Sequence, residues 1–324
     1  MIQKTKTAQN SLSVWLIHDH RSGHINQLQG LSERLSAHYK VKTSWFDANL
    51  NKVSWLDALF KKTNKTDDLA PPDIIIGAGH KTHKALLFNA RIYHAFSVVL
   101  MKPSLPLSLF DAIICPKHDK LKESNRVLNT CGALNKVNPA PHSTQKTKYL
   151  MLIGGPSKHF EWQEQTLFTQ IQAICSKHSD KEWLLSNSPR TPSSFMTQLM
   201  KLNIPNLCIY HYQDNNLEDL DSLLQQCAAV WITPDSASMV YESLTARAPS
   251  FLFNMSPSNK NKPTRVARSI LDLIQEQHIS SFQQWQSNSD IKAPTIINLW
   301  EADRAAQWLL NQYFEQLTCK REYE

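Results

Sequence analysis

An uninterrupted apolar run constrains the fold of this chain more than any other feature. Three isoleucines, Ile74 to Ile76, stand together between Asp73 and Gly77. A short β-branched run of this kind is typical of a strand that is buried on both faces, as in a parallel sheet covered by helices on both sides. The run therefore predicts a parallel sheet within an α/β protein.

Short apolar strands alternate with longer amphipathic segments along most of the chain. The helical segments carry apolar side chains at the 3.6-residue period, as Ile25, Leu28, Leu31 and Leu35 do. Such alternation implies parallel sheets with helices on both faces. We expect strands over residues 13–19, 41–46, 73–77, 97–101, 111–115, 149–153, 182–186, 207–210, 230–233 and 250–253, and helices over 81–93, 161–177 and 302–317.

A polar segment separates two such alternating runs. Residues 135–148 contain two prolines and show no apolar period, which is typical of a linker. The 324 residues also suit two domains of about 150 residues each. We therefore expect two Rossmann-like, doubly wound parallel-sheet domains with a cleft between them. The N-terminal domain is expected over residues 1–140, the C-terminal domain over 141–290, and a last helix within 291–324 that packs back on the N-terminal domain.

Composition bounds the location and the partners. No apolar run approaches the roughly 18 residues of a membrane span, and the N-terminal segment lacks a secretory cleavage pattern, so we expect a cytoplasmic protein. The six cysteines are scattered without a CxxC pair, as free thiols are in a reducing compartment. The net charge of +7 leaves two interpretations open, a solvated basic surface and peripheral contact with an anionic membrane on its inner face. Aromatic residues do not interleave with basic runs, so no nucleic-acid binding is expected.

In open parallel sheets, ligands bind beyond the carboxyl ends of the strands, so the loops after the strands are the candidate sites. Gly154, Gly155 and Ser157 follow one expected strand. Paired glycines allow a tight turn and a close approach to a ligand, and a following helix start suits a phosphate or diphosphate. An ordinary Gly-Gly turn is the alternative. The loop has neither the GxGxxG nor the GxxxxGK[ST] pattern.

The segment from Val230 to Leu244 carries a second signal. An apolar strand runs into Pro234, Asp235 and Ser236, and then into a helix. Asp235 or Ser236 suits the N-cap position, while Ser236 and Ser238 suit a phosphate at the helix start. Glu242 follows Ser238 by four residues and shares its helix face, from which a carboxylate reaches a ribose diol. A plain capping arrangement is the alternative.

A third loop holds Arg190 and Thr191, because the arginine fork matches phosphate oxygens. An exposed surface arginine is the alternative here. Asp219 and Asp221 form a D-x-D pattern, but it stands at a helix start, where acidic residues complement the helix dipole.

The first half offers the candidate base. His24, on a glycine turn after the first strand, has a side chain that titrates near neutrality and suits general-base chemistry on a sugar hydroxyl. Asp119, with His118, follows another strand and is its rival. His18, Asp19 and His20 also suggest a metal, although no further ligand set completes a coordination shell, and His83 is expected on an exposed helix face.

These segments together resemble the mitochondrial-fission Elm-type family, whose bacterial members are described as candidate glycosyltransferases. The resemblance covers roughly residues 13–274 and rests on the order and spacing of SGHINQ, PPDIIIGAGHKTH, FDAIICPKHD, LIGGPSKHF, SPRTP and ITPDSASMVYESL with the following ARAP. The chain departs from the family at three points. Pro189 stands where a second arginine is common, Asn-Asn-Leu precedes ITPDS where Asn-Pro-Tyr is usual, and Arg247 stands where a glycine is expected.

The resemblance implies a GT-B-like fold with the donor site mainly on the second domain. It implies a sugar transferred from a nucleotide-diphosphate donor to an envelope saccharide or lipid-linked acceptor, without a cofactor or a required metal. The alternatives are a non-catalytic GT-B-like scaffold protein and a nucleotide-sugar epimerase. The candidate catalytic residues are His24 and its rival Asp119. The candidate donor-binding residues, from the loops and the resemblance together, are Gly154, Gly155, Ser157, Arg190, Thr191, Asp235, Ser236, Ser238, Met239 and Glu242.

Overall fold

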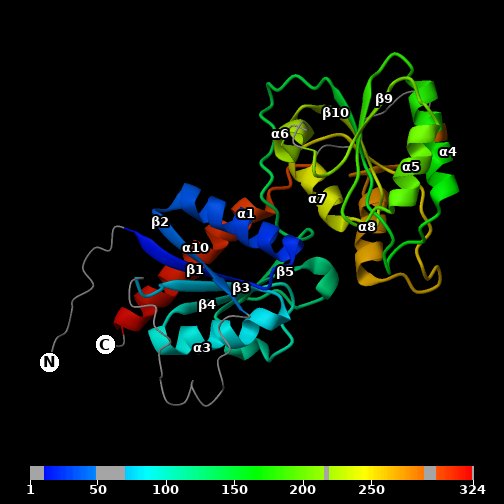
Figure 1. Cartoon of the computed structure of the whole chain (residues 1–324). Coiled ribbons are helices and arrows are strands. Elements are labelled where there is room, and N and C mark those ends of the chain that lie inside the picture. The colour runs from blue at the N-terminus through cyan, green and yellow to red at the C-terminus, as the bar shows by residue number, and fades with distance from the viewer. Residues whose placement is uncertain (1–10, 49–69, 215–218, 288–296, 323–324) are drawn as a thin grey trace. The chain divides into compact units, whose positions relative to one another are not determined.

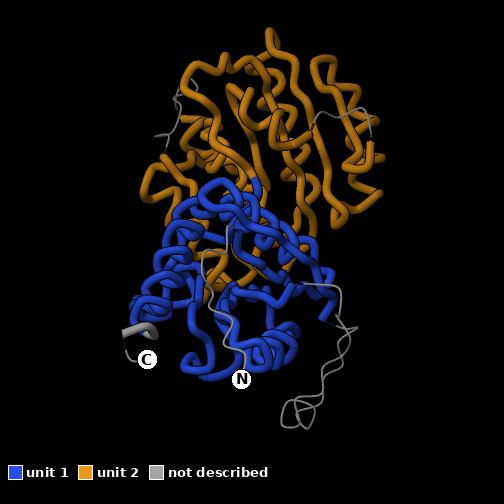
Figure 2. The backbone as a smooth tube through the Cα atoms, turned by 90° about the vertical axis from the view of Figure 1, so that its left-hand side faces the viewer, with its two compact units in different colours: residues 1–136, 301–324 blue, residues 137–300 orange. Residues whose placement is uncertain are grey.

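The computed structural model describes residues 11–48, 70–214, 219–287 and 297–322. The chain divides into two compact units (Figure 2). Unit 1 contains residues 1–136 and 301–324, and unit 2 contains residues 137–300. The last helix therefore belongs to unit 1. None of the helices within the described ranges combines the length and the apolar character that a membrane span requires.

Unit 1 is built on one parallel sheet with the strand order β2-β1-β3-β4-β5-β6 (Figure 1). Its strands are β1 (Leu12–His18), β2 (Val41–Asp47), β3 (Ile74–Ala78), β4 (Phe96–Leu100), β5 (Ala112–Pro116) and β6 (Val127–Thr130). The chain leaves β1 toward β2 on one side and returns to β3 on the other. A reversal of this kind is a topological switch point, where open α/β sheets bind ligands at the carboxyl ends of their strands.

Helices cover both faces of this sheet, as its apolar strands require. Leu16, Ile76 and Val98 pack with Leu28 and Leu31 of α1 and with side chains of α10 on one face. The other face packs against α3, which lies on the opposite side in Figure 1. The helical segments of unit 1 are α1 (Ser22–His38), α3 (His83–Tyr93), α10 (Glu301–Glu322) and the short η1 (His80–Thr82), η2 (Leu107–Leu109) and η3 (Lys117–Asp119).

Unit 2 holds a second parallel sheet, with the order β12-β11-β10-β7-β8-β9. Its strands are β7 (Lys148–Leu152), β8 (Trp183–Ser186), β9 (Leu207–Tyr210), β10 (Cys227–Ile232), β11 (Ser250–Leu252) and β12 (Ser280–Ser281). The chain enters at β7, moves out to β9, and returns to β10 on the other side of β7. This is the Rossmann order 3-2-1-4-5-6 read in chain order, and its switch point lies between β7 and β10.

The two faces of the second sheet are covered unequally. Phe168, Phe195 and Trp285, from α4, α5 and α9, join Trp183 and Trp231 of the sheet in one continuous core. α6 and α7 lie on the other side of the sheet in Figure 1. The helices of unit 2 are α4 (Glu164–Lys177), α5 (Ser193–Lys201), α6 (Leu220–Gln225), α7 (Ala237–Thr245), α8 (Arg265–Gln275) and α9 (Phe282–Ser287).

The expected fold class, two Rossmann-like parallel-sheet domains, is confirmed. Each expected strand lies within a few residues of its predicted place. Two strands escaped prediction because their sequences carry little apolar pattern. β6 is the edge strand Val-Leu-Asn-Thr, and β12 consists of two serines.

A buried carboxylate fixes α10 against α1. Asp303 Oδ1 accepts hydrogen bonds from Arg34 Nε and His38 Nε2, each at 2.7 Å, and the side chain of Asp303 is only 14% exposed. Burial alone would raise the pKa of Asp303, but the hydrogen bonds from His38 and Arg34 outweigh it and lower that pKa. The last segment of the chain is thus held to unit 1 by charge as well as by apolar packing.

We predict that Asp303→Asn lowers the free energy of unfolding of the protein by about 1–3 kcal/mol at pH 7, because it weakens hydrogen bonds to a charged acceptor. A carboxyl whose pKa is lower in the folded state stabilises the fold fully above its unfolded pKa of about 3.9 and loses this effect as the pH falls through the folded pKa. Urea unfolding at pH 7 measures the loss of stability, and urea unfolding at about pH 3 tests whether the difference between the variant and the wild type becomes smaller at acid pH. Glu315→Gln, on an exposed position of the same helix, is the control. An undiminished difference at acid pH would contradict the assignment.

Candidate functional site

Two polar clusters lie at the two switch points. We call the first, formed by Asp19, His24 and Gly79 in unit 1, the His24 cluster. The second, formed by Gly154, Gly155, Arg190 and Asp235 in unit 2, is the Arg190 cluster. Both lie just beyond the carboxyl ends of adjacent parallel strands, β1 and β3 in the first case, β7 and β10 in the second.

The His24 cluster is a histidine held by a buried carboxylate. β1 ends at His18, Asp19 follows it, and α1 begins at Ser22, so His24 stands in the first turn of that helix. His24 Nδ1 lies 2.7 Å from Asp19 Oδ1. The side chain of Asp19 is fully buried and that of His24 is 13% exposed. A carboxylate only accepts, so Nδ1 carries the proton and Nε2 is left as the acceptor nitrogen of the neutral ring.

The charge of Asp19 is maintained despite its burial. Burial raises the pKa of this carboxyl, but the hydrogen bond and charge of His24, with the Arg21 amide and guanidinium, lower it further than burial raises it. Asp19 is therefore ionised wherever His24 needs an orienting acceptor. From the sequence, Asp19 is expected only as part of a possible metal site. Its spacing of five residues from His24, across the strand–helix turn, is the signal for a dyad.

Gly79 provides the space for the ring. Its φ of 87° is one that side-chain-bearing residues rarely adopt. A Cβ at this position would lie 2.4 Å from Cε1 and 2.7 Å from Nδ1 of His24. The glycine after β3 is thus required by the histidine that follows β1.

The neighbouring histidines have other partners. His20 Nε2 lies 2.6 Å from Asp47 Oδ2, and the His20 ring packs edge-on against His18. Within the described part of the chain, no three His, Cys, Asp or Glu side chains gather as a metal site would require. The expectation for His83 was wrong. Its side chain is buried against Phe110 and lies 3.3 Å from Ser104 Oγ, since the first turn of α3 faces the core.

Asp119 lies apart from the His24 cluster. It ends η3, in the loop after β5, and Lys102 Nζ donates to its carbonyl. Strands β3 and β4 stand between β1 and β5, which separates the two loops by about 14 Å at 4.8 Å per strand. The topology does not bring Asp119 to the proton that His24 would take.

In the Arg190 cluster, a buried carboxylate joins two loops. Asp235 Oδ2 accepts from the Gly155 amide at 2.9 Å and from Arg190 Nη2 at 2.8 Å. Arg190 Nη1 also donates to the carbonyls of Gly155 and Pro156, each at 3.3 Å. The side chain of Asp235 is fully buried, whereas that of Arg190 is 43% exposed. Asp235 thus neutralises part of the charge that Arg190 would offer an anion.

The two glycines are required by protein packing. A Cβ on Gly154 would meet the Asp235 carboxylate at 2.3 Å, and one on Gly155 would meet the Arg190 carbonyl oxygen at 2.2 Å. The Gly154 amide donates to Thr233 Oγ1 at 2.7 Å, as the Gly155 amide does to Asp235. In this conformation both amides have partners within the protein. Thr233, a hydroxyl at the end of β10, was not foreseen.

Two further predicted residues hold the loops together. The Thr191 hydroxyl contacts the carbonyls of Ile153 and Gly154, and it accepts from the Ser188 amide at 2.9 Å. Ser157 Oγ accepts from the amides of His159 and Phe160 at 3.1 and 3.3 Å. These hydroxyls fix the shape of the loops after β7 and β8.

The start of α7 presents backbone amides in unit 2 that have no helical acceptor. Ser236 takes the N-cap position without a side-chain cap, and the preceding Asp235 is directed to Gly155. Within the described residues, the amides from Ala237 to Met239 have no acceptor. Ser238 is exposed and Met239 half-buried. Glu242 is buried and engaged within the fold, one helical turn further on.

The His24 cluster suits proton transfer, and the Arg190 cluster suits an anionic ligand. The His24 cluster can accept a proton at Nε2 while Asp19 stabilises the resulting imidazolium. The Arg190 cluster offers free helix-start amides, two serines, and the exposed half of a guanidinium to an anionic oxygen.

The sequence of this chain is similar to a known protein family and to one bacterial protein. A model of the family "Mitochondrial fission ELM1" matches residues 22–313. An uncharacterised protein of Rickettsia prowazekii is 25% identical, over 75% of this chain and 83% of that protein.

Two solved structures show the same architecture over nearly the whole chain. MurG of Acinetobacter baumannii matches with a TM-score of 0.53 and 10% identity, over 94% of this chain and 99% of that one. UDP-GlcNAc 2-epimerase of Neisseria meningitidis, bound to UDP-GlcNAc, matches with a TM-score of 0.53 and 12% identity, over 94% of this chain and 100% of that one. The fold is that of GT-B glycosyltransferases and epimerases.

We predict that Gly79→Ala destabilises the protein by about 1–3 kcal/mol, because the left-handed φ is strained for alanine and the methyl group collides with His24. Gly23→Ala is the matched control. It lies in the first turn of α1, and its Cβ would meet nothing within 4 Å. Alanine favours a helix over glycine, so this control should be neutral or stabilising by up to about 1 kcal/mol. Equal effects in denaturant unfolding would show that the ring does not depend on Gly79.

Proposed function

The chain belongs to the mitochondrial fission ELM1 family, and on this premise we propose that it is a glycosyltransferase. The proposed reaction moves a sugar from a nucleotide-diphosphate donor to a hydroxyl of an envelope saccharide or a lipid-linked acceptor.

The observation that carries this proposal is the Asp19–His24 pair at the switch point of unit 1. A base that acts on a sugar hydroxyl must have an accepting nitrogen of fixed direction, and the 2.7 Å contact with a buried carboxylate supplies one. The absence of a Cβ at Gly79 leaves the space that the ring occupies, which helps to fix its direction.

In the proposed step, the acceptor hydroxyl oxygen forms a bond to the anomeric carbon of the donor sugar. The bond from that carbon to the diphosphate oxygen breaks, and the diphosphate leaves with the electron pair. The hydroxyl proton passes to His24 Nε2, and Asp19 stabilises the resulting imidazolium. Positioned acid–base groups of this kind contribute about 10²–10⁴-fold to rate.

The departing diphosphate is assigned to unit 2. The amides that open α7, the hydroxyls of Ser236 and Ser238, and the exposed part of Arg190 support its binding there. A helix start contributes only about 0.3–1 kcal/mol when exposed, so several of these groups must act together. Glu242 is the proposed ribose contact, and Asp235 holds Arg190 and the glycine loop in place.

The proposal also covers the metal requirement and the cellular location. We propose no metal requirement, since Arg190 and α7 supply positive charge for the leaving group. A cytoplasmic location with peripheral contact at an anionic membrane surface stays a prediction that the +7 charge favours.

A nucleotide-sugar epimerase is the second candidate, favoured by the fold that the chain shares with the UDP-GlcNAc 2-epimerase bound to its ligand. The two activities separate in one assay. Isomerised donor that appears without any acceptor would favour the epimerase, whereas donor consumption that requires an acceptor would favour the transferase.

The first test is a thermal-shift screen of nucleoside diphosphates and their sugars. A ligand that binds the native state must raise the melting temperature, by the equivalent of about 2.7 kcal/mol at a hundredfold excess over Kd. We expect a shift with at least one nucleotide sugar, and a smaller shift in Glu242→Gln if the carboxylate binds ribose. The absence of any shift across the screen would favour a scaffold role.

With the active donor identified, His24→Gln should lower kcat by about 10²–10⁴-fold while the Kd of the nucleoside diphosphate stays unchanged. Asp19→Asn should lower kcat by a smaller factor, because the imidazole loses its orienting acceptor but remains present. Asp119→Asn is the control and should retain activity. Activity that survives in His24→Gln and disappears in Asp119→Asn would reverse the assignment of the base.

A further inference from the structure

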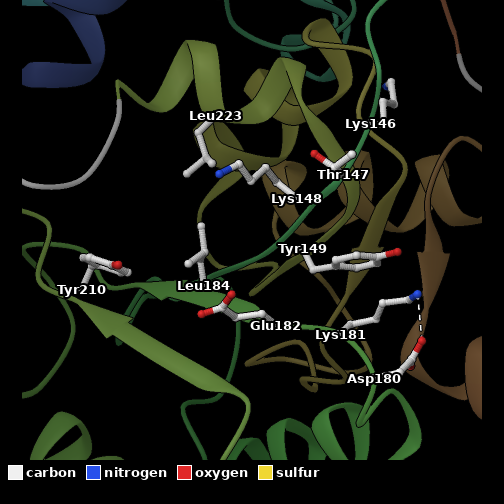
Figure 3. Close-up of a pocket in the computed structure, with 10 residues that line it drawn as sticks. All are labelled: Lys146, Thr147, Lys148, Tyr149, Asp180, Lys181, Glu182, Leu184, Tyr210 and Leu223. Carbon is white, nitrogen blue, oxygen red and sulfur yellow. Dashed lines mark ion pairs between the residues drawn. The ribbon is translucent and has the colours of Figure 1, made fainter.

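A large hollow lies in unit 2, away from the Arg190 cluster. It encloses about 720 Å³, and its residues come mostly from the amino ends of β7 and β8 (Figure 3). The Arg190 cluster lies at the opposite ends of the same strands, about 16 Å away along five-residue β7. The hollow is lined by Lys146, Thr147, Lys148, Tyr149, Asp180, Lys181, Glu182, Leu184, Tyr210 and Leu223.

The hollow exists because one sheet face is incompletely covered. Alternate residues of each strand point to opposite faces, so Leu184 and Tyr210 lie on the face away from α4 and α5. Both are only half-buried, whereas their neighbours Trp183 and Leu185 are fully enclosed in the core. Within the described residues, the helix nearest in sequence to this face is α6, and it spans only Leu220–Gln225.

Lys146 brings a poorly compensated charge to this hollow. Its side chain is half-buried, and its ammonium donates to the Arg247 carbonyl. Burial lowers the pKa of Lys146, Cys227 raises it, and the Arg247 charge lowers it again. Among the residues that the structure describes, no carboxylate lies within ion-pair distance of Lys146. Charges removed from water are normally paired with an opposite charge, so this site favours an anion.

Arg247 adds a second cation whose partners are neutral. Its guanidinium donates to the Ala140 carbonyl at 3.0 Å and to Asn298 Oδ1 at 2.6 Å, and Nη1 lies 3.4 Å from His142 Nε2. Its φ is 57°, the left-handed conformation that ends a helix and that glycine adopts without cost. This is the position at which the family resemblance led us to expect glycine. A strained arginine there places positive charge beside Lys146.

The two carboxylates of the hollow have partners. Asp180 pairs with Lys181 at 2.8 Å, and Glu182 Oε1 accepts from the Cys208 thiol at 3.3 Å. The apolar side chains Leu184, Leu223 and Tyr210 lie on the side opposite Lys181 and Tyr149 in Figure 3. The hollow thus has positively charged lysine side chains and an apolar wall.

We propose that this hollow binds a small organic phosphate, with the phosphate at Lys146 and the organic group against Leu184, Leu223 and Tyr210. The site is separate from the proposed donor site and does not depend on the glycosyltransferase proposal. Lys148 also lines the hollow and adds a positive charge to it.

Phenyl phosphate is the probe, titrated by calorimetry into the full chain at low ionic strength. We expect saturable binding that becomes at least fivefold weaker in Lys146→Met, which keeps the stem of the side chain and removes the charge. Lys201→Met removes an exposed lysine of α5 and should leave the affinity unchanged. Inorganic phosphate should bind several-fold more weakly than phenyl phosphate, because it has no group for the apolar wall.

A melting experiment without ligand gives an independent readout. If Lys146 is a half-buried charge without an anionic partner, Lys146→Met should melt about 2 °C higher than the wild type, and phenyl phosphate should raise the melting temperature of the wild type only. Undiminished affinity in Lys146→Met would overturn the proposal. So would the absence of saturable binding, or binding that is lost in Arg190→Gln, which would assign the phosphate to the donor site.

Discussion

The register of two strand pairs is the constraint on which both polar clusters depend. Ile17 lies beside Gly77 in the β1–β3 pair, so two residues further on the chain brings Asp19 beside Gly79. Leu152 lies beside Ile232 in the β7–β10 pair, which brings Gly155 beside Asp235. A slip of one residue would turn these side chains to the opposite face. In the observed register, the isoleucines of β3 and the apolar residues of β10 are buried on both faces.

The same constraint explains which parts of the site could be predicted from sequence. Strand ends can be located from apolar runs, and the carboxyl edge follows from parallel topology, so His24 and Arg190 were found as residues after strands. The sequence suggested Asp19 only as a possible metal ligand. Its pairing with His24 depends on which histidine side chain the first turn of α1 directs toward it, and this cannot be read from the sequence. Thr233 and the burial of His83 depend on which face of a short segment packs inward, and a single sequence does not contain that information.

Unit 2 shows why a glycine-rich loop is a weak indicator of ligand contact. Gly154 and Gly155 were expected to let a diphosphate approach closely, yet the space beside each is occupied by Asp235 and the Arg190 backbone. Their amides are also paired. A buried carboxylate at this point opposes an anion directly beside it, so the proposed phosphate would have to bind at the outer part of Arg190 and at the amides that open α7. In that proposal, Asp235 would act on the ligand through Arg190, with which it is paired.

The cationic side chains at the two ends of the second sheet have different partners. Arg190 is paired with a buried carboxylate, which gives its guanidinium a defined direction. A side chain that recognises a single ligand oxygen needs such a fixed direction. Within the described part of the chain, Lys146 donates to a carbonyl oxygen, and Arg247 contacts a carbonyl oxygen, an amide oxygen and the Nε2 atom of His142. The backbone of Arg247 is also left-handed. An uncompensated charge and a strained residue both reduce stability. We therefore attribute their occurrence together to the proposed ligand rather than to the needs of folding.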